Sequence, residues 1–84
     1  MSSREKRALI DPAMEPVARA KAADTLVWEV PEATTEYFVL RDEAVHEALA
    51  GGVDAEQVGS ALGVQVSDIE RMAGDYARRQ SHAR

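Results

Sequence analysis

The segment from Ala55 to Met72, AEQVGSALGVQVSDIERM, constrains the fold of this chain more than any other. Gly63 follows the last apolar residue of its first half, where left-handed backbone ends a helix without a side-chain penalty. Gly59 lies in mid-helix, where Gly costs roughly 1 kcal/mol relative to Ala and indicates that a second helix crosses close to the backbone. Four larger apolar residues at helical spacing give each half one apolar stripe: Val58, Leu62, Ile69 and Met72. The segment therefore predicts two short helices joined by a tight turn.

The spacing of a few residues in this segment resembles the bacterial helix-turn-helix. In that motif a small residue lies four positions before a Gly, a hydrophobe follows the Gly, and further hydrophobes come five and eight positions later. The residues that match here are Gly59, Gly63, Val64, Ile69 and Met72. The preceding segment, RDEAVHEALAGGVDAEQ, looks like the helix and Gly-rich joint before this motif in small actinobacterial DNA-binding proteins. The resemblance implies that the start of the second helix enters the DNA major groove.

Carried over position by position, the resemblance implies five residues that face DNA: Gln65, Val66, Ser67, Glu70 and Arg71. Gln65 suits adenine, Val66 a thymine methyl group, and Arg71 a guanine. Asp68 and Glu70 repel phosphates, although acidic residues also stabilise a helix N-terminus. Gln65 is a poor helix cap, whereas Ser67 and Glu70 form a capping box. We therefore expect this helix to begin at Ser67, with Gln65 and Val66 in a longer turn.

Proline and glycine mark the boundaries of the earlier helices. Pro16 favours a first helix that starts near Glu15. Pro31 restricts the residue before it to extended backbone and suits the first position of a new helix. From Pro31 to Ala50 the apolar residues, with the clear exception of Val39, occupy one half of a helical wheel, which favours one long helix. Gly51 and Gly52 then supply left-handed backbone at its C-terminus.

A β-hairpin over residues 25–40, packed on the helix-turn-helix, is the competing fold. Residues 26–30 are apolar at adjacent positions, which fits a strand or a buried helical turn equally well. Thr, Tyr, Phe and Val in residues 34–39 also favour strands. The linking residues PEAT, however, contain neither the Gly nor the Asn of a tight hairpin turn. We therefore predict an all-α fold, a small helical bundle with a C-terminal helix-turn-helix preceded by a long helix.

The chain has 84 residues, which is the length of one small domain. Its basic start carries Arg4, Lys6 and Arg7, which we expect to form a flexible arm that contacts DNA phosphates or the minor groove. Small domains bury a modest fraction of their surface, and this chain is rich in Ala, so the composition is compatible with a homodimer. The expected organisation is an arm over 1–11, a helical domain over 12–80 with the helix-turn-helix at 54–79, and a frayed tail over 81–84.

Several classes of protein fit the composition poorly. The chain has no Cys, which excludes disulfides and thiolate metal sites. No apolar run is long enough for a signal peptide or a membrane span, so we expect a cytoplasmic protein without a membrane partner. His46 and His82 lie far apart and have no nucleophile or carboxylate spaced to pair with them. We therefore expect no enzyme activity, no cofactor and no metal.

The charge distribution leaves two functions open. The net charge is −5, and from Asp42 onward eight acidic residues outnumber four arginines. Affinity for nucleic acid depends mainly on phosphate neutralisation, so this favours a narrow basic footprint on DNA or a protein partner. We expect a sequence-specific regulator of transcription that binds double-stranded DNA. The alternative is an acidic interaction module, antitoxin-like or a phage-type adaptor that binds a host protein. Its anchors, unless they pack in the core, would be Trp28, Tyr37, Phe38 and Val39.

Overall fold

The structure is a computed structural model and describes residues 10–82. Over this range the chain is all-α, as predicted, and forms no strand. The elements are α2 (Pro16–Glu29), the 3-10 turn η1 (Pro31–Ala33), α3 (Thr34–Ala50), α4 (Ala55–Leu62) and α5 (Val66–His82). The alternative hairpin over residues 25–40 is wrong, because residues 25–29 complete α2 and residues 34–40 begin α3.

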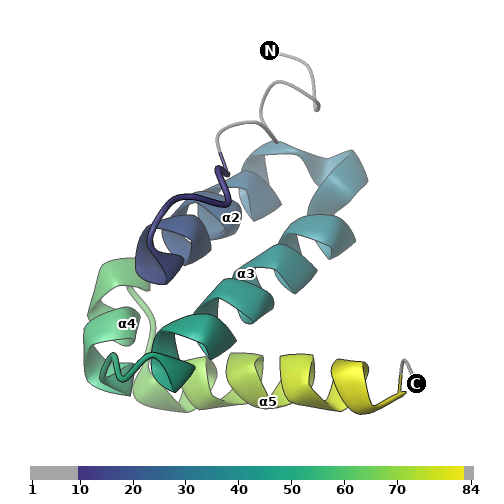
Figure 1. Cartoon of the computed structure of the whole chain (residues 1–84). Helices are drawn as coiled ribbons and strands as arrows, with labels where there is room; N and C mark the ends of the chain where they lie inside the picture. Colours follow the sequence, from purple (N-terminus) through teal and green to yellow (C-terminus); the bar gives the residue numbers. More distant parts are fainter. Residues whose placement is uncertain (1–9, 83–84) are drawn as a thin grey trace.

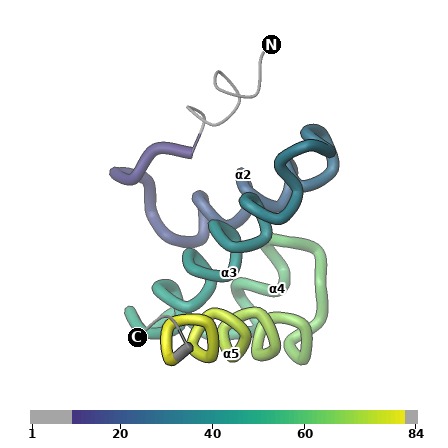
Figure 2. Tube along the Cα trace, turned by 90° about the vertical axis from the view of Figure 1, so that its right-hand side faces the viewer, coloured from purple at the N-terminus to yellow at the C-terminus, as the bar shows by residue number. Residues whose placement is uncertain are grey.

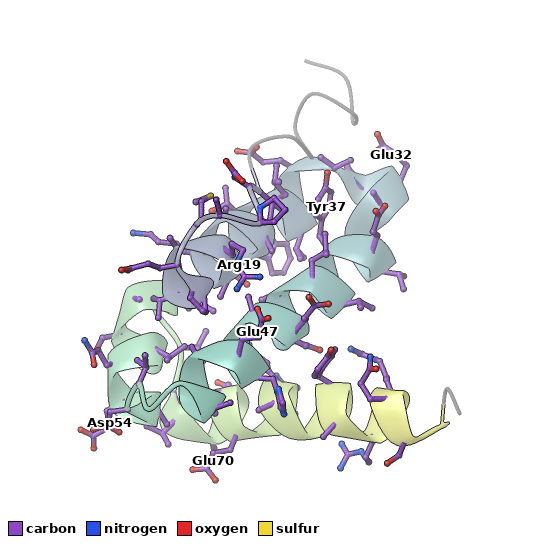
Figure 3. The ribbon with its side chains drawn as sticks, viewed as in Figure 1. Arg19, Glu32, Tyr37, Glu47, Asp54 and Glu70 are labelled. Carbon is purple, nitrogen blue, oxygen red and sulfur yellow. The ribbon has the colours of Figure 1, made fainter. Side chains whose placement is uncertain are left out.

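Helices α2 and α3 form an antiparallel pair, and α5 lies across one end of it next to α4 (Figure 1). Val30 interrupts the helical path with φ −127° and ψ 79°, the extended backbone expected before Pro31. The Thr34 hydroxyl then donates hydrogen bonds to the carbonyl oxygens of Val27 and Pro31, at 3.3 and 3.0 Å. Farther along the pair, Arg19 of α2 forms an ion pair with Glu47 of α3 (Figure 3).

The end of α3 differs from the prediction in one residue. Gly52 has the left-handed φ of 95°, but Gly51 has φ −81°. Gly51 continues the helical hydrogen bonding instead, because its N–H donates to the Glu47 carbonyl oxygen at 2.9 Å. One left-handed residue is therefore enough to end α3. Asp54 then caps α4, since its Oδ1 accepts a hydrogen bond from the backbone N–H of Glu56 at 3.3 Å.

The corner between α4 and α5 has the predicted tight turn. Gly63 adopts φ 73°, and the N–H of Val64 donates to the Gly59 carbonyl oxygen at 2.9 Å. A Cβ atom at Gly59 would lie 2.8 Å from the carbonyl oxygen of Val64. Gly59 is therefore required by a close backbone approach, although the turn itself makes most of that approach and Ile69 of α5 lies farther away.

Helix α5 begins at Val66, one residue before the start at Ser67 that the capping box predicted. The carbonyl oxygen of Gln65 accepts hydrogen bonds from the N–H groups of Asp68 and Ile69, at 3.0 and 3.2 Å. Val66 is therefore the first helical residue, and Ser67 lies exposed within the first turn. The prediction of a longer turn failed because the Gln65 carbonyl organises the first turn without a side-chain cap. The helix continues through Gly74 and reaches His82.

Seen from the side, α5 runs below α3 and α4 (Figure 2). The buried hydrophobic residues, apart from Ala23, form two clusters. The larger cluster joins all four helices: Ala20, Ala44, Val45, Ala48, Val58, Ile69 and Met72. The smaller cluster lies near the turn between α2 and α3: Leu26, Val27, Val30 and Tyr37. The larger cluster holds α4 and α5 against the rest of the chain, so it sets the position of the corner.

Candidate nucleic-acid interface

The first turns of α5 present a polar surface that the rest of the described chain leaves uncovered. Gln65, Ser67, Glu70 and Arg71 are exposed, and Val66 is half-buried. Ser67, Glu70 and Arg71 are three and four residues apart, so they are neighbours on one helical face. Figure 3 shows Glu70 pointing away from the body of the protein. The structure thus brings together the five α5-side residues that the resemblance indicated.

Arg71 is held by a weak contact. Its Nη2 lies 3.5 Å from Oδ1 of Asp68, one turn earlier on the same helix. The two side chains are 61% and 43% exposed. Ion pairs at such exposed positions contribute between about 0 and 1 kcal/mol. Arg71 can therefore leave Asp68 for another acceptor at small cost.

The other arginines of α5 are also paired with carboxylates. Arg78 forms an ion pair with Asp75 at the same i,i+3 spacing. Arg79 reaches across to α3, where its Nη1 lies 3.0 Å from Oδ2 of Asp42. Helix α5 carries three acidic and three basic residues over 66–82, so its charges balance. A basic rim of unpaired arginines is therefore not present around Ser67 in the described part of the chain.

The predicted basic arm lies elsewhere in the sequence. Arg4, Lys6 and Arg7 fall outside the described residues, so their relation to α5 stays a prediction. Of the residues expected to contact DNA, the structure places only the set on and just before α5.

Asp42 was missed by the sequence reasoning. Its side chain is buried, with 2% of the residue exposed, and its Oδ1 accepts hydrogen bonds from Nε and Nη2 of Arg41 at 3.3 and 3.2 Å. Arg41 also donates from Nη1 to Oδ1 of Asp24 on α2 at 3.2 Å. The helical period of the sequence could have indicated this burial, because Asp42 lies four residues after Phe38 and three before Val45, in line with apolar residues.

The aromatic residues divide into buried and exposed positions. Tyr37 is 1% exposed and belongs to the smaller core cluster, which removes it as an anchor for a partner. Phe38 and Val39 are half-buried. Trp28 is 79% exposed, so core packing is the wrong role for it. His46 is half-buried, and its ring centroid lies 5.1 Å from that of Tyr76.

Other kinds of site find no support among residues 10–82. Within that range no three His, Asp or Glu side chains are grouped so that they could hold a metal ion. The helices described there lack the combination of length and apolarity that crossing a membrane requires. Comparison with protein-family models, curated proteins and solved structures finds no match to the chain. A function can therefore be proposed only from the geometry of α4 and α5.

Proposed function

We propose that this protein is a sequence-specific DNA-binding protein, without enzyme activity, that regulates transcription in the cytoplasm. The observation that supports the proposal is the corner made by α4, Gly63 and α5, with the first turn of α5 facing solvent. In helix-turn-helix proteins this turn lies in the major groove while the preceding helix crosses the phosphate backbone.

The start of α5 at Val66 supports the assignment of base contacts. Gln65 lies directly before the helix, at the position that caps the recognition helix in the family. The register carried over from the resemblance therefore needs no shift: Gln65 suits adenine, Glu70 accepts from cytosine, and Arg71 pairs with guanine. Each good bidentate contact contributes about 1–3 kcal/mol of discrimination. This exceeds the cost of about 0–1 kcal/mol for separating Arg71 from Asp68.

The balanced charge of α5 predicts an unusual dependence on salt. A protein that neutralises few phosphates releases few counterions, and the slope of log K against log salt is about −0.9 per contact. With about two or three phosphate contacts per chain, we expect a slope of roughly −2 to −3. Non-specific binding is then weak, and base contacts carry most of the selectivity.

The test uses two arginines in matching surroundings. Arg71 and Arg78 each pair with an Asp three residues earlier on the same helix, but only Arg71 belongs to the surface at the start of α5. The wild-type chain first selects its preferred duplex from a random library. Arg71→Ala should then weaken binding to that duplex by about 5- to 150-fold and relax preference at one base pair. Arg78→Ala should have a small effect that is equal for all sequences.

Two outcomes would overturn the proposal. One is the absence of any enriched sequence together with no retention of duplex at low salt. The other is an equal effect of both substitutions on the selected and on unrelated duplexes. Either result would leave the α5 surface without a role in reading bases.

A protein partner is the second candidate function. The observation that favours it is the 79% exposure of Trp28, because exposed Trp residues are frequent anchors of protein interfaces. An acidic adaptor or antitoxin-like module would also fit the net charge of −5. A pull-down from host lysate separates the two functions: a captured protein should survive nuclease treatment and be lost with Trp28→Ala.

A further inference from the structure

Trp28 is a large apolar side chain that belongs neither to the buried core nor to the polar surface at the start of α5. It is the single Trp of the chain, lies on α2 and is 79% exposed. No other large apolar side chain among the described residues is exposed to this degree. An indole has a large apolar area and an N–H donor, and Trp is enriched at the centre of protein interfaces. Its exposure therefore indicates a surface that is completed by another molecule.

A groove with suitable chemistry lies between α3 and α5. The two helices diverge away from the α4 corner (Figure 1), and their diverging halves line a groove of about 400 Å³. Phe38, Val39 and Met72 supply its apolar lining, and Arg41, Arg71 and Arg79 supply guanidinium groups. The guanidinium carbon of Arg41 already lies 4.7 Å from the centroid of the Phe38 ring.

This lining matches an indole better than it matches other side chains. Guanidinium groups interact favourably with aromatic faces, and Trp is the best of the aromatic partners. Thioethers also make favourable contacts with aromatic rings. The groove combines both with a neighbouring Phe ring, so its preferred occupant is a partly polar aromatic side chain such as that of Trp.

The distribution of charge indicates which molecule supplies the Trp side chain that occupies the groove. Residues 10–82 contain fourteen acidic and six basic residues. The ion pairs around the groove use four of each: Asp24, Asp42, Asp68, Asp75, Arg41, Arg71, Arg78 and Arg79. The groove lining itself carries three arginines and two aspartates, so it lacks the acidic excess of the described chain as a whole. Two acidic copies of the chain repel one another in general but can approach at this surface, where the charges nearly balance.

A chain of contacts links the part of α2 that carries Trp28 with the groove. Trp28 lies one helical turn after Asp24, so the two are neighbours on α2. Asp24 accepts a hydrogen bond from Arg41 at 3.2 Å, and Arg41 lines the groove. A projecting side chain and a groove on one molecule become complementary when a two-fold axis passes between two copies.

The geometry points to a homodimer in which Trp28 of each copy occupies the α3–α5 groove of the other. This association requires no nucleic acid, so it can be tested independently of the proposed function.

The single Trp makes the test direct, because its fluorescence reports one position. Sedimentation equilibrium and Trp emission are followed together over a dilution series without DNA. The mass should fall from about twice 9.2 kDa toward 9.2 kDa on dilution. Over the same range the emission maximum should shift to longer wavelength as the indole enters water.

Three variants test the two halves of the contact. Trp28→Ala removes the projecting side chain, and Val39→Glu places a charge in the groove without touching the fully buried core. Both should be one-chain species at every concentration, and Val39→Glu should keep the emission of an exposed indole. Ser60→Glu adds the same charge at an exposed position on α4 and should associate like wild type. Far-UV circular dichroism checks that all three remain helical.

Several results would overturn the inference. A one-chain mass at all concentrations would remove the dimer. A dimer whose Trp emission stays that of an exposed indole, or that persists in Trp28→Ala, would place the interface elsewhere. An emission maximum that is blue-shifted but independent of concentration would mean that Trp28 is covered within its own chain.

Discussion

Nη1 of Arg79 donates a hydrogen bond of 3.0 Å to Oδ2 of Asp42, which lies 37 residues earlier in the chain. The Asp42 side chain is 3% exposed, and its other oxygen accepts from Arg41. Burial of a carboxylate is tolerated only where its charge is paired and its oxygens accept hydrogen bonds. The contact therefore fastens the C-terminal half of α5 to the middle of α3.

Replacing Asp42 tests the energy of this contact. Asp42→Ala leaves Arg41 and Arg79 without their shared acceptor, and we expect the free energy of unfolding to fall by about 1–3 kcal/mol. Asp75→Ala is the control, since its exposed pair with Arg78 should contribute less than about 1 kcal/mol. Urea unfolding measures both, and a double-mutant cycle with Arg79→Ala isolates the pair. Equal losses for the two Asp variants would contradict the structural role of Asp42.

Two glycines within helices are expected to respond in opposite directions. Gly59→Ala puts a Cβ 2.8 Å from the Val64 carbonyl oxygen, so the corner must shift, at a cost of about 1–3 kcal/mol. Gly74→Ala meets nothing within 4 Å and should stabilise α5 by about 0.5–1 kcal/mol. Thermal unfolding of both variants provides the comparison. Stabilisation by Gly59→Ala would mean that the α4–α5 corner is looser than described.

The left-handed residue of the turn gives a third prediction. Gly63 has φ 73°, a conformation that costs a residue with a Cβ about 1–2 kcal/mol. Gly63→Ala should lower the free energy of unfolding by this amount, although open space surrounds the position. Gly63→Asn should lose less, because Asn tolerates this backbone. Chemical denaturation that ranks Asn with Ala, or finds no loss for Ala, would refute the backbone argument.

Removing the carboxylate beside Arg71 should affect stability and DNA binding in opposite senses. Asp68→Ala deletes an acidic residue from the first turn of α5, which should cost some tenths of a kcal/mol. It also frees Arg71 and lowers phosphate repulsion, so duplex affinity should rise a few-fold if the proposed function is correct. Asp75→Ala removes the same charge seven residues later and should raise affinity less. Fluorescence anisotropy at fixed salt measures both, and a fall in affinity for Asp68→Ala would count against the α5 surface.

Much of the corner was predictable because its requirements are local. A left-handed residue at Gly63 and a close approach at Gly59 both follow from glycine at those spacings. The β-favouring residues of the α2–α3 turn were harder to interpret. Val27, Val30 and Tyr37 favour strands, but they bury one another across a helical pair, and tertiary packing outweighs intrinsic propensity.

Three features depended on information that local patterns do not hold. The helical period sets Asp42 in line with apolar residues, but the arginine that makes its burial tolerable, Arg79, comes from a distant part of the chain. Trp28, for which the sequence left core packing and partner binding open, is exposed because the faces of α2 that pack in the core carry Ala, Leu and Val instead. Helix α5 starts at Val66 because a backbone carbonyl, which every residue possesses, outweighs the side-chain preference of Ser67.

Helix α5 is anchored at both ends, by the Val64–Gly59 backbone contact at its start and by Asp42 toward its finish. These two contacts fix α5 relative to α4 at one end and relative to α3 at the other. Whatever surface α5 presents is thus preorganised, and a ligand that meets it loses little affinity to ordering the helix.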